Sequence, residues 1–173
     1  MPGDRAEQTD EPDDRAGERM VVERTIAADP AAIFAVLRDP RGHVAIDSSG
    51  MLMSSSDAPV SGVGDRFVVH MNREALGDRP MGDYDVIVTI VAYEPDREIA
   101  WTVQGRDRPS AGHVFRYVLE PVENGTLVTS SSDWSGIAPE VKKAGIFPVL
   151  PETTLRATLG ILARTVEGRG RVE

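Results

Sequence analysis

The stretch Phe147–Arg171 reads FPVLPETTLRATLGILARTVEGRGR and predicts one long amphipathic helix. Its apolar residues recur four, three and four positions apart, at Leu155, Leu159, Leu162 and Val166. This spacing places them on one face of an α-helix. Pro151 suits the first turn, where its missing N–H costs nothing, and Gly168 suits the end. A helix of about 17 residues would be about 25 Å long, enough to cross one small sheet.

The chain before this helix consists mostly of strand patterns separated by short turns. The predicted strands are Arg19–Ala28, Met51–Ser54, Arg66–Arg73, Asp83–Tyr93, Glu98–Gln104, His113–Glu120 and Thr126–Trp134. Asn124-Gly125 is the strongest hairpin signal. Short turns between so many strands favour an antiparallel meander over βαβ units.

Two short helices are expected between the first two strands. Asp29 can cap the first helix, Pro30 occupies its first turn, and Asp39-Pro40 stops it. A second helix or turn follows over Arg41–Asp47. The sequence thus predicts an α+β domain in which a curved sheet of six or seven strands wraps around the C-terminal helix.

Composition restricts the class of function. The 173 residues suit one domain, 19–168, between an acidic disordered tail, 1–18, and a flexible C-terminus, 169–173. A net charge of −9 opposes binding to nucleic acid or anionic membranes. We find no apolar run that could span a bilayer and no secretory signal, so we expect a cytoplasmic bacterial protein without membrane insertion. Exposed strand edges permit a homodimer.

Several segments resemble the helix-grip proteins of the SRPBCC or START-like superfamily, which includes the polyketide cyclase/dehydrase proteins. The segments are IAADPAAIFAVLRDPRGHVAIDSSG, GVGDRF, HVFRYVLEP, NGTLVTSSSDW and FPVLPETTLRATLGILARTVE. Together they extend over roughly residues 20–168. The resemblance is specific for the fold, and it implies a pocket for a hydrophobic ligand between the sheet and the last helix.

His43 and Asp47 are the first candidates for chemistry. Their spacing would place them on one face of a short helix, where the carboxylate would raise the pKa of the imidazole and select its tautomer. The pair would then act as a catalytic acid and base, or orient a ligand carbonyl. The alternative is a structural role, in which the pair lies on the helix surface or caps the Ser48-Ser49-Gly50 turn.

The positions of the other two histidines favour a role in chemistry less strongly. Strand alternation turns His70 toward solvent, whereas His113 begins a strand and is either a rim residue or a pocket acid. No histidine belongs to an HxxxH or HExxH arrangement, and the chain has no cysteine. We therefore expect no metal and no cofactor.

The predicted ligand-binding residues are mainly apolar and aromatic, as pocket walls are. They are Phe34, Met51, Phe67, Met71, Trp101, His113, Phe115, Tyr117, Leu155 and Leu159. Arg156 and Thr158 are the polar residues of the last helix nearest to this set, and both are expected to face solvent. The run Thr129–Asp133 is unusually polar, which indicates either a partly polar cavity or an exposed edge strand.

Three functions follow. The first is binding of a small hydrophobic or aromatic molecule in the cavity. The second is a reaction like that of polyketide cyclases or dehydratases, with a His, Tyr or Asp of the pocket as acid or base. The third is a protein–protein adaptor without a cavity.

Overall fold

The structure is a computed structural model and describes residues 17–168. Most of the predicted acidic tail and all of the predicted flexible C-terminus lie outside these residues. Glu18, the last residue of the predicted tail, belongs to the folded part, since its carboxylate pairs with Lys142 Nζ at 2.8 Å. None of the described helices is long and apolar enough to span a bilayer.

Seven antiparallel strands form one sheet. They are β1 (Arg19–Ile26), β2 (Leu52–Ser54), β3 (Arg66–Asn72), β4 (Asp83–Glu94), β5 (Glu98–Gly105), β6 (Val114–Val122) and β7 (Gly125–Asp133). Their order in the sheet is β1-β7-β6-β5-β4-β3-β2. The predicted meander is confirmed, and the first strand joins it by pairing with the last, from Arg19 opposite Asp133 to Ile26 opposite Thr126.

The helices are α1 (Pro30–Leu37), α2 (Pro40–Ile46), η1 (Glu74–Leu76), α3 (Pro139–Lys143) and α4 (Glu152–Glu167). The sequence predicted α1, α2 and α4 close to their observed bounds. It missed η1 and α3, which are short and have no buried residue, so no apolar periodicity marks them.

The two short helices begin and turn for local reasons. Asp29 stands at the N-cap position of α1 but makes no capping bond with its side chain, whereas Asp39 accepts one from the Arg41 N–H at 3.0 Å. Gly42 lies where the two helices approach most closely. A Cβ there would be 1.9 Å from the Val36 carbonyl oxygen. The tight α1–α2 corner thus requires glycine.

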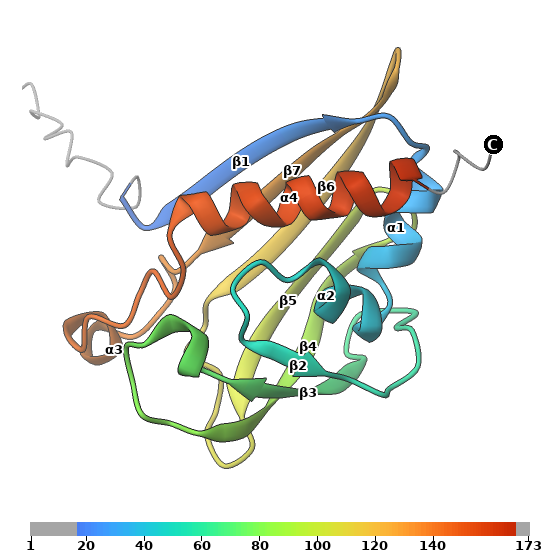
Figure 1. Ribbon diagram of the computed structural model, residues 1–173. Coiled ribbons are helices and arrows are strands. Elements are labelled where there is room, and N and C mark those ends of the chain that lie inside the picture. Colours follow the sequence, from blue (N-terminus) through green and yellow to red (C-terminus); the bar gives the residue numbers. More distant parts are fainter. Residues whose placement is uncertain (1–16, 169–173) are drawn as a thin grey trace, which may run out of the picture.

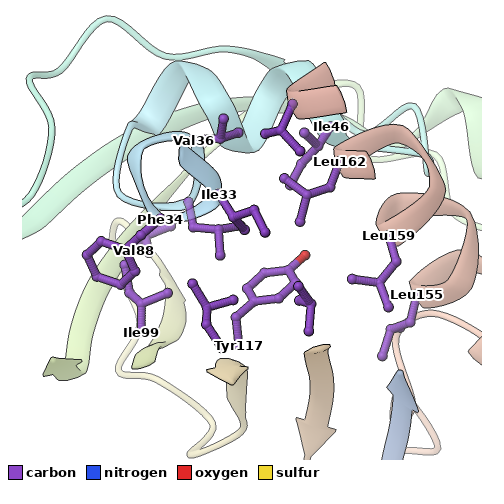
Figure 2. Packing of buried hydrophobic residues seen from close by; sticks show 14 of the residues in the cluster. Ile33, Phe34, Val36, Ile46, Val88, Ile99, Tyr117, Leu155, Leu159 and Leu162 are labelled. Carbon is purple, nitrogen blue, oxygen red and sulfur yellow. The ribbon is translucent and has the colours of Figure 1, made fainter. Parts of the chain in front are cut away.

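The core lies between α4 and the concave side of the sheet, with α1 and α2 covering one end (Figure 1). The buried residues of α4 are Leu155, Leu159, Leu162, Ala163 and Val166. Figure 2 shows Leu155 and Leu159 projecting from α4 toward the ring of Tyr117. The predicted α+β architecture, a curved antiparallel sheet around a long C-terminal helix, is confirmed.

Candidate ligand-binding cavity

A cavity of about 270 Å³ lies between the sheet, α2 and the first half of α4. Its apolar wall consists of Ile46, Met51, Leu52, Val69, Met71, Val86, Val88, Trp101, Val103, Phe115, Val149, Leu150 and Leu155. This volume lies just below the roughly 300–1,000 Å³ of most ligand pockets, so the cavity suits a small molecule. The domain is therefore hollow, which the adaptor hypothesis did not expect.

Aromatic rings form a continuous part of the wall. Trp101 stacks on Phe115 and Tyr117, with ring centres 5.9 and 5.7 Å away and interplanar angles of 26° and 28°. His43 meets Trp101 edge-on at 4.8 Å, and His113 meets Phe115 edge-on at 5.4 Å. We call these five residues the aromatic wall. Such a surface offers offset or edge contacts to an aromatic or flat apolar ligand.

His43 is buried and uncharged near neutral pH. Its Nε2 donates to the Leu37 carbonyl oxygen at 2.7 Å, so this nitrogen carries the proton and Nδ1 is left as a hydrogen-bond acceptor. Burial lowers the pKa of His43, and it outweighs the Leu37 bond and the charge of Asp39, which both favour protonation. His43 therefore lines the cavity as a neutral ring with one acceptor nitrogen.

The predicted His43–Asp47 pair does not form. α2 ends at Ile46, so Asp47 has an extended backbone and leaves the helix face that His43 occupies. Its carboxylate instead accepts bonds from the following turn: Ser49 N at 3.0 Å, Ser49 Oγ at 2.7 Å and Gly50 N at 3.0 Å. These contacts match the alternative role predicted from the sequence, in which the pair caps the Ser48-Ser49-Gly50 turn, although only Asp47 takes part. Asp47 still lines the cavity.

His113 is the second buried histidine of the wall. Burial lowers its pKa. Among the described residues, Nδ1 has no hydrogen-bonding partner, and the ring packs against Phe147 at 4.7 Å. His70 is exposed as predicted and lies outside the cavity, where its Nδ1 contacts Asp85 at 2.5 Å.

Tyr117 supplies a hydroxyl that stays protonated. Burial raises its pKa to about 12, the charge of Asp47 adds to this effect, and a hydrogen bond with Ser130 opposes it. The hydroxyl can therefore donate at neutral pH, while His43 can accept. A hydrogen-bond donor and an acceptor in one cavity wall can orient a polar group of a ligand.

The structure places the ten predicted ligand-binding residues in two groups. Those that line the cavity are Met51, Met71, Trp101, His113, Phe115, Tyr117 and Leu155. Phe34, Phe67 and Leu159 lie in the packed core instead. Phe34 contacts Tyr93 edge-on, Phe67 contacts His43, and Leu159 is 1% exposed. Phe67 and Leu159 share a face of their strand or helix with wall residues, but neighbouring side chains cover them, whereas Phe34 lies on α1, which does not border the cavity.

Sequence reasoning missed several polar wall residues. Thr158 lines the cavity rather than facing solvent, whereas Arg156 is exposed as predicted and pairs with Glu152. Ser48 Oγ donates to the Thr154 carbonyl oxygen at 2.8 Å and lies 2.8 Å from Thr158 Oγ1. The Ser48 hydroxyl has a single proton, which it gives to the Thr154 carbonyl, so the Thr158 hydroxyl must donate to Ser48 Oγ. Toward a ligand, the Thr158 hydroxyl can then only accept a hydrogen bond. Thr158 follows Leu155 by three residues, and this helical spacing could have indicated that both side chains face the cavity.

The polar run on the last strand also contributes to the wall. β7 lies between β1 and β6, so it is not an edge strand. Ser130, Ser131 and Ser132 are buried, and the first two line the cavity. The partly polar cavity is therefore the correct alternative for this segment. Within residues 17–168, no three His, Asp or Glu side chains are arranged to hold a metal ion.

Buried neutral histidines make stability depend on pH. The unfolded chain protonates His43 and His113 near their ordinary pKa of 6.5, and the folded chain resists this. We therefore expect the free energy of unfolding to fall as the pH drops below 6.5, by up to about 1.4 kcal/mol per pH unit for each histidine. Aspartates whose pKa is lowered in the folded chain cause a further loss of stability only near and below pH 3.8.

Urea unfolding at several pH values between about 7 and 5 measures this slope. His43→Asn should reduce it, and adding His113→Asn should reduce it further. An equal slope in the wild type and the double variant would contradict the assignment.

The family model for polyketide cyclase/dehydrase and lipid transport proteins matches residues 18–167. The chain belongs to this family. No curated protein gives a significant match to it.

Solved structures agree on the fold. A crystal structure of a protein from Chromobacterium violaceum has a TM-score of 0.63 at 16% identity, covering 87% of this chain and 98% of the other. An AHSA1-like protein from Aeromonas hydrophila has a TM-score of 0.56 at 19% identity, with 88% and 94% covered. The Aha1 dimer from Colwellia psychrerythraea has a TM-score of 0.54 at 20% identity, with 86% and 96% covered. For this chain, a homodimer and a cytoplasmic location stay predictions.

Proposed function

We propose that this protein binds a small, mainly apolar molecule with a flat or aromatic body in the cavity beneath α4. The observation that carries the proposal is the aromatic wall, which faces a preformed space of about 270 Å³. A largely apolar cavity with a few polar groups is the usual form of a small-molecule site.

The polar groups of the wall support a ligand with one hydrogen-bonding function. His43 offers an acceptor nitrogen and Tyr117 offers a hydroxyl proton, and both stay neutral near pH 7 because burial disfavours their charged forms. A ligand hydroxyl or carbonyl would satisfy one of them. Asp47, the other predicted catalytic residue, contributes by holding the α2–β2 turn that borders the cavity.

The test begins with native mass spectrometry of the purified protein, alone and after incubation with a lipid extract, followed by titration with naphthalenemethanol. We expect a retained small molecule or a thermal shift with the probe. Neither a retained molecule nor a shift across a panel of apolar and aromatic compounds would contradict the proposal.

A cavity-filling variant separates binding in the cavity from binding elsewhere. Val103 lines the cavity on β5, so Val103→Phe should place a phenyl ring in the ligand's space and weaken probe binding at least about tenfold, equivalent to about 1.4 kcal/mol. Val118 on β6 is 39% exposed and outside the cavity, so Val118→Phe is the matched control. Equal affinity in both variants would place the probe at another site.

A further inference from the structure

Arg73 belongs to the wall of the largely apolar cavity. It follows directly after β3, its side chain is 11% exposed, and it lines the cavity together with Tyr84 and Val86 of β4. The aromatic wall borders the same space through Phe115 and Trp101. A buried charge is costly unless a partner of opposite charge accompanies it.

The present partner of Arg73 is the carboxylate of Asp78. Nε donates to Oδ1 at 2.8 Å and Nη2 donates to Oδ2 at 2.8 Å, which is the two-pronged geometry typical of arginine and a carboxylate. Asp78 belongs to the β3–β4 connection and its side chain is 44% exposed. Release of Asp78 would return a group that is already partly hydrated to water, and a ligand carboxylate would replace the pair that Arg73 loses.

The other arginine of the wall lacks these features. Arg116 is 36% exposed and pairs with Glu98 of β5, which lies on the neighbouring strand of the same sheet. Glu98 is held by the strand, so it cannot move away as a loop residue can. Arg73 is thus the cationic group of the cavity that is both mostly buried and paired with a loop carboxylate.

We propose that the ligand is an amphipathic carboxylic acid, whose carboxylate takes the place of Asp78 on Arg73 while its apolar body lies against the aromatic wall. This proposal rests on the proposed function and specifies the chemical class of the ligand. The two-pronged guanidinium fits a carboxylate better than it fits a hydroxyl or a carbonyl. The apolar body adds burial that Asp78 cannot offer.

The experiment compares naphthoic acid with naphthalenemethanol, and decanoic acid with decanol, by calorimetric titration of the full chain near neutral pH. We expect the wild type to bind each acid at least about tenfold more tightly than its alcohol, since only the acid can form a two-pronged, charged pair with the guanidinium. Arg73→Met should abolish this preference and leave the affinity for the alcohols within about threefold.

Two further variants distinguish a ligand anchor from a structural ion pair. Asp78→Asn removes the competing carboxylate and should increase affinity for the acids, opposite to the effect of Arg73→Met. If the pair only holds the loop, both variants should change binding of acids and alcohols alike. Arg156→Met is the control, because Arg156 also pairs with a carboxylate but is 58% exposed and outside the cavity. Arg73→Lys replaces Arg73→Met if the latter fails to fold, and should retain only part of the preference.

The outcomes separate the two proposals. Equal binding of acids and alcohols by the wild type, or a preference that survives in Arg73→Met, would overturn the carboxylate assignment and leave the cavity's function standing. Binding of neither class would contradict the proposed function itself.

Discussion

Gly42→Ala is expected to lower the free energy of unfolding by about 3 kcal/mol or more, at the upper end of the cost of overpacking. The added Cβ would lie 1.9 Å from the Val36 carbonyl oxygen and 2.9 Å from its carbonyl carbon. Both atoms belong to the backbone, so no side-chain rotation relieves the contact. The α1–α2 corner must open, and His43, the next residue, must move with it. Chemical denaturation measures the loss.

Gly105→Ala provides the control for this experiment. Position 105 ends β5, and a Cβ there meets no atom within 4 Å. This variant should remain close to the wild type in stability and in probe binding. A similar loss in both variants would mean that a general effect of glycine replacement, rather than the close approach at Gly42, accounts for the result.

Leu159→Ala should cost about 2–5 kcal/mol of unfolding free energy, as is usual for a leucine truncated within a packed core. Leu159 is 1% exposed and lies outside the cavity wall. Leu155, one turn earlier on α4, borders the cavity, so part of its surface already lacks packing partners. We expect Leu155→Ala to cost clearly less, because it enlarges an existing space instead of creating one.

Thermal and urea unfolding of the two variants tests this difference in stability. Ligand titration of the same variants tests whether affinity changes as well. Leu155→Ala should change the affinity for the naphthalene and decyl probes, since the cavity's size changes. Leu159→Ala should affect stability more than affinity. Equal losses of stability would contradict the separation of core from wall on this helix.

The sequence predicted the architecture well because the signals for it are local. Pro151 and Gly168 bracket α4, its leucines recur with helical spacing, and Asn124-Gly125 marks the β6–β7 hairpin. These features depend on neighbours a few positions away. Even the corner between α1 and α2 was evident from Asp39-Pro40.

The site was harder to predict because a cavity is a property of the whole sheet. Strand parity correctly turned Trp101 inward, but it could not tell Phe67, which is covered by His43, from Met71, which lines the space. The predicted His43–Asp47 pair was wrong because α2 ends at Ile46, one residue before Asp47. Arg73 carried no sequence signal, because its place in the wall and its pairing with Asp78 of the β3–β4 connection depend on the folded structure.

The pairing of β1 with β7 has a consequence for biosynthesis. Arg19 lies opposite Asp133, so the first strand emerges from the ribosome long before its partner exists. The serines of the cavity wall belong to that late partner, and α4 follows later still. A growing chain therefore exposes an unpaired β1 edge and half a cavity until synthesis is nearly complete, and such distant pairing slows folding. Only the finished chain can capture a ligand, and a ligand captured then would favour the completed fold.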